Sequence, residues 1–233
     1  MTLRALITGA SRGLGAALAD SLAEQGALVF AGTRSPKRAL DAIIERRPGR
    51  VVAVDLDVTS DESVSRALST VGAETQAIDI LINNAAIRSP SVSNPIETID
   101  FGDVARTFEV NSIGPLRVVQ AFLPLLRKGS SPVLVNVSSE AGSLGGCRRD
   151  REFDYCMSKA AMNMATALLA NYLRGKVRVL SLHPGWLRTD MGGANATLDP
   201  ETTARAIIEL IRRESEQQGG PGFIDHEGRS LPW

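Results

Sequence analysis

Short apolar runs alternate with amphipathic stretches along the whole chain. The runs are rich in β-branched residues and have no polar residue at every second position, as expected of strands that are buried on both faces of a parallel sheet. They cover residues 3–8, 28–33, 51–56, 78–86, 131–139 and 177–185. We predict a strand in each of them, and a last strand in "GFIDH" at 222–226.

The stretches between these runs have the apolar spacing of helices. Leu14, Leu18 and Leu22 recur every fourth residue, which places them on one helix face. A similar stripe is formed by Val64, Leu68 and Val71, after a candidate capping box of Thr59 and Glu62. Further stripes occur in 36–48, 103–127, 153–174 and 200–214. The alternation of strands and helices predicts an α/β fold, a doubly wound parallel sheet with right-handed crossovers and helices on both faces. No linker or repeat interrupts it, so we expect a single domain over residues 1–233.

Composition narrows the class of protein. Lys plus Arg equals Asp plus Glu at 26 each, so no basic field favours nucleic acid or an anionic membrane as a partner. Cys147 and Cys156, with two histidines, form neither a disulfide framework nor a metal motif, and we expect no metal. The chain starts with a strand-like run instead of a signal sequence, and no apolar run reaches the roughly 18 residues of a membrane span. We expect a cytoplasmic protein.

Three glycines lie between the first strand and the first helix. Gly9, Gly13 and Gly15 allow positive φ and the close approach of a pyrophosphate to a helix N-terminus, where free N–H groups point outward. Their spacing is G-x-x-x-G-x-G and not the commoner G-x-G-x-x-G. This turn either binds a dinucleotide or is simple turn chemistry.

Each of the two tyrosines is followed four residues later by a lysine. The pairs are Tyr155 with Lys159 and Tyr172 with Lys176, and residues four apart share a helix face. A neighbouring ammonium favours the phenolate and so lowers the tyrosine pKa from about 10. Either pair could therefore transfer a proton to or from a substrate oxygen.

Context separates the two pairs. Tyr155 begins an apolar helix that follows the strand ending in "NVSS", and ligands bind at the carboxyl ends of parallel strands. Tyr172 lies ~25 Å away at the other end of that helix. Gly175 precedes Lys176, which places this lysine beyond the helix. We predict that Tyr155 and Lys159 are the catalytic pair, that Tyr172 is a packing residue and that Lys176 is a solvated charge.

Several motifs occur in the order typical of one enzyme family. They are "TGASRGLG" at 8–15, "DLDV" at 55–58, "NNAA" at 83–86, the Asn of "EVNS", "NVSS" followed by "YCMSK", and "PGWLRTDM" at 184–191. Over nearly its whole length the chain resembles the short-chain dehydrogenase/reductase family. "SSEAGSLGG" and the ending "GFIDHEGRSLPW" are most similar to its C-factor-like and Sniffer-like carbonyl reductases. The resemblance implies a Rossmann-type fold and an NADP(H)-dependent oxidoreductase acting on a carbonyl or secondary alcohol.

The resemblance also implies four catalytic residues. Tyr155 would be the general acid and base, and Lys159 would also bind the nicotinamide ribose. Ser139 would hold the substrate oxygen, since alignment of the serine doublet favours it over Ser138. Asn111 would hold a water that relays protons to Lys159; otherwise it is a helix-interior Asn that faces solvent.

Further residues are implied to bind the cofactor. Asp57 would bond the adenine edge, Asn83 would help to fix the turn near the adenine ribose, and Thr189 would contact the nicotinamide end or its phosphate. Asp57 could instead cap a strand end, and Thr189 could cap the turn that follows it. Ala86 departs from the family, which usually has Gly there. The implied cofactor-binding set also includes Gly9, Ser11, Arg12, Gly13, Leu14, Gly15, Thr33, Arg34, Val58, Ala85, Tyr155, Lys159, Pro184 and Gly185.

The end of the second strand indicates which dinucleotide is used. An acidic residue about 20 positions after the glycine motif accepts hydrogen bonds from the ribose of NAD, whereas an Arg suits the 2′-phosphate of NADP. Thr33 stands in the acid's place and Arg34 follows it. The resemblance puts Arg12 near the same phosphate. We predict that NADP(H) is favoured over NAD(H).

Two other functions stay open at this level. A non-catalytic NADP(H)-sensing or signalling protein would not need the proton donor. A 3-oxoacyl thioester reductase would need a basic dock for its carrier. Arg148, Arg149 and Arg151 lie near the expected pocket and either meet an anionic substrate or form a solvated loop. The family often pairs through two long helices, which implies a homodimer or homotetramer.

Overall fold

The computed structural model describes residues 2–34, 38–213 and 222–233. Its centre is a seven-stranded parallel sheet in the order β3-β2-β1-β4-β5-β6-β7. The strands are β1 Arg4–Thr8, β2 Leu28–Thr33, β3 Val51–Asp55, β4 Ile80–Asn83, β5 Val133–Val137, β6 Arg178–His183 and β7 Gly222–Asp225. Every predicted strand is therefore present.

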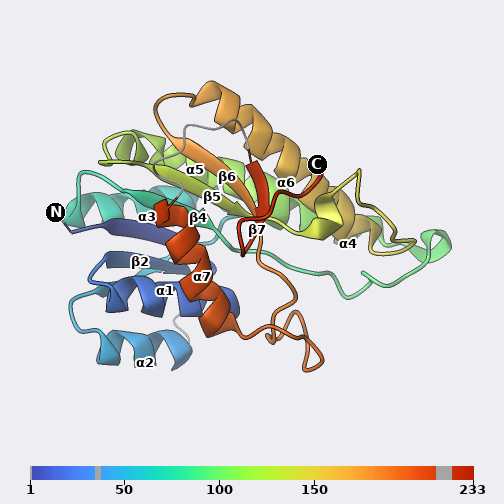
Figure 1. The fold of residues 1–233 in the computed structure, drawn as a ribbon, viewed down its shortest axis with the longest axis horizontal. Helices are drawn as coiled ribbons and strands as arrows, with labels where there is room; N and C mark the ends of the chain where they lie inside the picture. The colour runs from blue at the N-terminus through green and yellow to red at the C-terminus, as the bar shows by residue number, and fades with distance from the viewer. Residues whose placement is uncertain (1, 35–37, 214–221) are drawn as a thin grey trace.

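Helices cover both faces of this sheet (Figure 1). On one face lie α1 Gly13–Glu24, α2 Arg38–Arg46 and α7 Pro200–Arg213. The other face is covered by α3 Asp61–Glu74, α5 Gly114–Leu126 and α6 Phe153–Tyr172, and α4 Phe101–Phe108 packs on α6. The predicted doubly wound α/β fold is confirmed.

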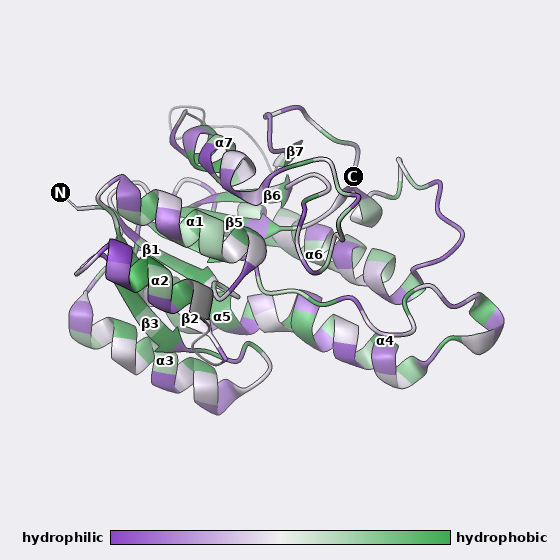
Figure 2. Ribbon diagram, turned by 90° about the horizontal axis from the view of Figure 1, so that it is seen from below, coloured by the Kyte–Doolittle hydropathy of each residue, from purple (hydrophilic) through white to green (hydrophobic). Residues whose placement is uncertain are grey.

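Two separate cores explain why the strands are apolar at consecutive positions. Along β1, Ala5 and Ile7 belong to the core beneath α1, α2 and α7, while Leu6 belongs to the core beneath α3 and α5. Since successive side chains of a strand point to opposite faces, both sets must be apolar. Figure 2 shows the result, with strands in the hydrophobic colour and helices that carry both colours. Among the described helices, none has the length and apolarity to cross a membrane.

The structure corrects two local predictions. The single helix expected over 103–127 is α4, then a π-helical segment η2 at Glu109–Ile113, then α5. Helix α3 is capped by Ser60, whose side chain accepts from Ser63 N at 3.1 Å, so the capping box does not start at Thr59. Ser60 Oγ also donates to Glu62, the acidic residue of the predicted capping box. The capping residue is therefore one position later than predicted, at Ser60 instead of Thr59.

The strand order shows at which edge of the sheet a ligand would bind. From β1 the chain proceeds to β2 and β3 on one side, and then returns to β4 on the other side of β1. Ligands of such sheets bind at this reversal, outside the carboxyl ends of the strands. The loops after β1, β4, β5 and β6 meet there, on the right of Figure 1.

Candidate active site

The glycine turn after β1 is closely packed against the chain that follows β4. Gly9 and Gly13 have φ of +67° and +55°, which side chains rarely adopt. A Cβ on Gly15 would lie 2.3 Å from the Gly9 carbonyl oxygen, and one on Gly9 would lie 2.8 Å from Ala85 Cα. No residue with a side chain fits at these positions without a shift of the backbone.

The turn fits a dinucleotide phosphate by its chemistry as well as its shape. Helix α1 starts directly after it, and the Arg12 side chain does not cap the helix N-terminus. The first turn of α1 contains no acidic residue. Its N–H groups and the positive end of the helix dipole are therefore suited to an anion.

Asn84, not Asn83, holds this turn. Its Nδ2 donates to the Thr8 and Gly9 carbonyl oxygens at 3.0 and 3.1 Å. Asn83 is 2% exposed, and its Nδ2 donates to Asn136 Oδ1 at 2.8 Å, between β4 and β5. The Asn83 side chain therefore does not contact the glycine turn, because neighbouring residues at a strand end point in opposite directions.

Asp57 and Thr189 each accept hydrogen bonds from residues a few positions further along the chain. These are the capping contacts that the sequence offered as an alternative to cofactor binding. Asp57 Oδ1 accepts from Thr59 N and Oγ1 at 2.9 and 2.7 Å. Burial raises the pKa of Asp57, but these bonds and nearby arginines outweigh it, so the net pKa is lowered. Thr189 Oγ1 accepts from Gly192 N at 3.3 Å, while its methyl group faces Gly13. Thr189 therefore lies beside the glycine turn.

The remaining cofactor-binding candidates lie on the same edge of the sheet. Gly185 has φ of +81°, and a Cβ there would lie 2.3 Å from Leu198 Cδ1. Val58 is buried and Pro184 is half-buried. Ala86 has a negative φ: among the described residues, Glu152 is the one non-glycine residue whose φ is positive. The departure from Gly at position 86 therefore introduces no strain.

The cations predicted to recognise a 2′-phosphate border this edge. Thr33 ends β2 as a buried residue, and the exposed Arg34 follows it. Arg12 Nη1 contacts Asp190 Oδ2 at 2.5 Å, and both side chains are more than 70% exposed. This ion pair bridges the glycine turn and the loop after β6.

Tyr155 lies in the first turn of α6, half-buried. Burial raises the pKa of its phenol, while a hydrogen bond with the Ser139 side chain and the charges of Arg88 and Arg149 lower it; the net pKa is raised. Lys159 Nζ is 5.7 Å from the ring centroid. The expectation that Lys159 brings the tyrosine pKa below its ordinary value is wrong for this geometry, since desolvation has the larger effect.

Lys159 is a buried ammonium group. Its side chain is among the largest that are fully buried, and Nζ donates to the Val137 carbonyl at 2.8 Å. Burial lowers its pKa from 10.5 to about 8. The lysine therefore changes charge near neutral pH, which suits a proton-transfer site.

This lowered pKa predicts a pH-dependent stability. Between about pH 8 and pH 10.5 the unfolded chain binds a proton at Lys159 that the folded chain has lost. Stability rises with pH wherever the unfolded state binds more protons. Relative to Lys159→Met, the unmodified protein should gain about 3 kcal/mol of unfolding free energy across this window. Urea unfolding of both proteins at pH 7, 9 and 10.5 measures it; a constant difference would contradict the buried ammonium.

The two serines after β5 point to different partners. Ser138 is 3% exposed, and its Oγ donates to Asn163 Oδ1 at 2.6 Å. Ser139 is half-buried, accepts from Ala141 N at 3.1 Å and lies near enough to Tyr155 to lower the pKa of its phenol. The fold therefore places Ser139 beside Tyr155 and uses Ser138 to anchor α6.

Asn111 is fully buried in η2 and does not face solvent. Its Oδ1 accepts from Ile87 N at 2.8 Å, and Nδ2 donates to Ile87 O and Ser158 Oγ at 2.9 and 3.1 Å. Ser158 Oγ in turn donates to the Tyr155 carbonyl at 2.8 Å. The π-helical turn thus ties the chain after β4 to the helix that carries Tyr155 and Lys159, and π-helical turns are frequent at functional sites.

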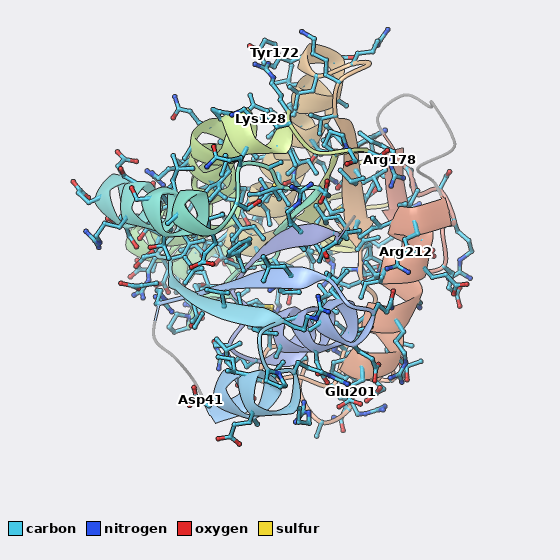
Figure 3. All side chains as sticks on the ribbon, turned by 90° about the vertical axis from the view of Figure 1, so that its left-hand side faces the viewer. Asp41, Lys128, Tyr172, Arg178, Glu201 and Arg212 are labelled. Atoms are coloured by element: carbon cyan, nitrogen blue, oxygen red, sulfur yellow. The ribbon has the colours of Figure 1, made fainter. Side chains whose placement is uncertain are left out.

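Tyr172 is at the far end of α6 and points away from the sheet (Figure 3). Its side chain is 70% exposed, with the Arg127 guanidinium 5.9 Å from the ring centroid. It is therefore a surface residue, and the expectation of a packing role is wrong because Tyr172 lies on the outer face of α6, while the next residue, Leu173, is buried in the core. Helix α6 ends at Tyr172, so Lys176 lies beyond it as predicted, on the surface.

All three loop arginines contact protein groups, and Arg151 Nη1 donates to the Ser93 carbonyl at 3.5 Å. Arg149 forms ion pairs with Glu140 at 2.8 Å and with Glu152. Arg148 donates to its neighbouring carbonyl, of Cys147, at 2.7 Å. His183 Nδ1 accepts from Glu140 N at 3.2 Å, and burial lowers its pKa. These contacts order the loop before α6.

The chain matches the family model described as short chain dehydrogenase over residues 4–198. The chain belongs to this family. Over 161 residues it is 41% identical to the C-signal of Myxococcus xanthus, a match that covers 68% of this chain and 95% of that protein. Among the described residues, no group of three or more His, Cys, Asp or Glu side chains is placed to hold a metal ion.

Two solved structures are similar to this short-chain dehydrogenase over their full lengths. The carbonyl reductase Sniffer of D. melanogaster superposes with a TM-score of 0.92 at 30% identity. The NADPH-bound carbonyl reductase from chicken fatty liver superposes with a TM-score of 0.90, also at 30% identity. Each comparison covers 100% of both chains. The resemblance to C-factor-like and Sniffer-like proteins is confirmed.

Three residues of this short-chain dehydrogenase were missed in the sequence. Asn84 was present in "NNAA", but only its bonds to the glycine turn distinguish it from Asn83. Asn163 accepts from Ser138 and Ser181 and donates to the Gly142 carbonyl, so it joins β5, β6 and α6. Arg88 follows "NNAAI", and no spacing in the sequence relates it to Tyr155.

Proposed function

We propose that this protein is an NADP(H)-dependent carbonyl reductase or alcohol dehydrogenase, with residues 1–233 acting as one cofactor-binding domain. The observation that carries the proposal is the arrangement around Tyr155. The Ser139 side chain lies beside its phenol, a buried lysine lies one helical turn along α6, and the glycine turn is at the same edge of the sheet. When bound, the cofactor supplies or accepts a hydride at its nicotinamide ring.

The protein's own residues provide for the substrate oxygen. Ser139 holds the oxygen by a hydrogen bond, and Tyr155 donates a proton to it as negative charge develops. Lys159 Nζ lies close enough to stabilise the phenolate that remains. It would also bind the nicotinamide ribose. The side-chain amide of Asn111 is bonded to Ile87 and Ser158, and we propose that this residue also holds the water that relays protons to Lys159.

The adenine end of the cofactor is bound by the predicted residues around β2 and the glycine turn. Thr33 replaces the acid that would repel a 2′-phosphate, and the Arg34 and Arg12 guanidiniums are suited to forked bonds with its oxygens. The NADPH-bound chicken reductase supports this preference. Asp57 would bond the adenine edge with Val58 beside it, and Thr189 would contact the nicotinamide end or its phosphate.

The Arg12–Asp190 ion pair should weaken binding of NADPH. Asp190 offers Arg12 a carboxylate that competes with the 2′-phosphate. An exposed pair contributes about 0–1 kcal/mol, so Asp190→Asn should tighten NADPH binding by up to about 5-fold. Fluorescence titration of NADPH measures this, with NADH as the control, since its affinity should hardly change. Equal tightening for both dinucleotides would show that Asp190 acts elsewhere.

A substrate panel tests the proposed function directly. Aldehydes, ketones, quinones and 3-oxoacyl thioesters are each supplied with NADPH, and its oxidation is followed. We expect steady turnover of at least one class. Inactivity with all four classes, in folded protein with measured NADPH binding, would overturn the proposal.

The second candidate is a signalling protein that binds NADP(H) without turnover. It is favoured by the 41% identity to the relative named C-signal. Tyr155, Ser139, Lys159 and Asn111 favour the enzyme, because a sensor needs no proton donor. A thioester reductase is less favoured, since Arg149 of the loop before α6 is already paired with Glu140 and Glu152. We further propose a cytoplasmic homodimer or homotetramer that acts on small molecules.

A further inference from the structure

A second cation lies against the ring of Tyr155. Arg88 belongs to the segment after β4, far from α6 in the sequence, and its Cζ is 5.6 Å from the ring centroid. Lys159 Nζ is 5.7 Å from the same centroid. A guanidinium within about 6 Å of an aromatic face is attracted to it, and it favours a negative charge on the phenol oxygen.

Arg88 is held in this position by the residue that precedes α6. Its guanidinium forms an ion pair with Glu152, whose side chain is 16% exposed. Glu152 has φ of +63°, a left-handed conformation that non-glycine residues rarely adopt. Glu152 also pairs with Arg149, which in turn pairs with Glu140. This network joins the loop after β4, the loop after β5 and the start of α6.

We propose that Arg88 is a positioning residue that fixes the Tyr155 ring and stabilises its deprotonated form through the charge placed over it. The inference rests on the proposed role of Tyr155 as proton donor. It gives the tyrosine a cation besides Lys159, one that the "Y-x-x-x-K" spacing does not reveal.

Among the charged and titratable groups around Tyr155, Arg88 is the best placed to stabilise the phenolate. Lys159 and Cys156 share its helix, Arg149 and Glu140 approach from the loop after β5, and His183 lies behind them on β6. Burial raises the pKa of Tyr155 most strongly, and Arg88 and Arg149 both oppose it. The Arg149 charge is shared between two carboxylates, whereas Arg88 has one and contacts the ring.

The chain offers a direct measurement, because it has only two tyrosines. In Tyr172→Phe, Tyr155 is the sole tyrosine, and the ultraviolet absorbance of tyrosinate reports its ionisation alone. An opposite charge at this distance shifts a pKa by about 1–3 units, and the ion pair with Glu152 reduces the effect. Arg88→Met and Arg88→Gln in this background should therefore raise the titration midpoint by about one unit, and Arg88→Lys should restore most of it.

Arg127→Met is the matched control. It removes the same group from the other end of α6, near position 172, and should leave the Tyr155 midpoint unchanged. Far-ultraviolet circular dichroism at each pH confirms that the variants stay folded. An unchanged midpoint in folded Arg88→Met and Arg88→Gln would overturn the proposal, as would an equal shift in Arg127→Met.

A kinetic measurement provides a second readout. With a substrate from the panel, the pH at which alcohol oxidation reaches half its maximum should move upward in Arg88→Met and return in Arg88→Lys. A merely structural role would lower the rate at every pH without moving this midpoint, which would count against the proposal. The absorbance titration needs no substrate, so it tests Arg88 even if the panel shows no turnover and the proposed function fails.

Discussion

Tyr155→Phe should lower kcat/KM for any good carbonyl substrate by about 10²–10⁴-fold, the usual contribution of a positioned general acid. The substitution removes one hydroxyl from a half-buried ring, and the Ser139 side chain keeps its bond from Ala141 N. The fold and the affinity for NADPH should therefore change little. NADPH oxidation with the best substrate of the panel, beside fluorescence titration of the cofactor, separates the loss of chemistry from a loss of binding.

Tyr172→Phe is the matched control for this experiment. It makes the same chemical change on the same helix, but at an exposed position that faces away from the sheet (Figure 3). Turnover should stay within about 2-fold of the unmodified protein, since surface substitutions of this kind have small effects. An inactive Tyr172 variant beside a normal Tyr155 variant would refute the assignment of the catalytic pair.

Replacing Thr33 by Asp together with Arg34 by Gln should reverse or erase the preference for NADPH. The carboxylate would repel the 2′-phosphate of NADPH and accept hydrogen bonds from the ribose of NADH. A bond to a charged group contributes about 1.5–3 kcal/mol, so losing one guanidinium and adding repulsion should change the ratio of the two specificity constants on the order of 10²-fold.

The measurement compares kcat/KM for NADPH and NADH in the double variant and in the unmodified protein. Arg50→Gln is a suitable control, because Arg50 is also an exposed arginine but donates to the Gly26 carbonyl at the opposite end of β2. It should leave the ratio unchanged. Equal specificity constants for the two dinucleotides in the unmodified protein would show that Thr33 and Arg34 do not select NADPH.

The sequence by itself determined the elements of the fold and the place of the candidate site. Apolar runs with polar stretches between them can be buried only as strands with helices on both faces, which is what the two cores show. Local geometry also determined that Gly9, Gly13 and Gly15 form a turn before α1, and that Tyr155 and Lys159 share one helix face. These properties depend on residues a few positions apart in the chain, so they can be predicted from periodicity and spacing.

The tertiary structure decided which of two adjacent candidates reaches the site. Asn84 bonds the glycine turn while Asn83 points into the sheet, and Ser139 meets Tyr155 while Ser138 meets Asn163. Adjacent residues of an extended chain point to opposite sides, and no local pattern states which side faces the crevice. Only the packing of β4 and β5 against their neighbours settles it.

Ionisation and long-range contacts were likewise beyond the sequence. A helical spacing suggested that Lys159 lowers the Tyr155 pKa, but burial of both groups has the larger effect, and burial is a property of the folded core. Arg88 and Glu152 are 64 positions apart in the chain and meet only because the loops after β4 and β5 end at the same edge of the sheet. The chemistry of the tyrosine therefore depends on contacts that form when the parallel strands assemble, whereas its position on α6 follows from the helix alone.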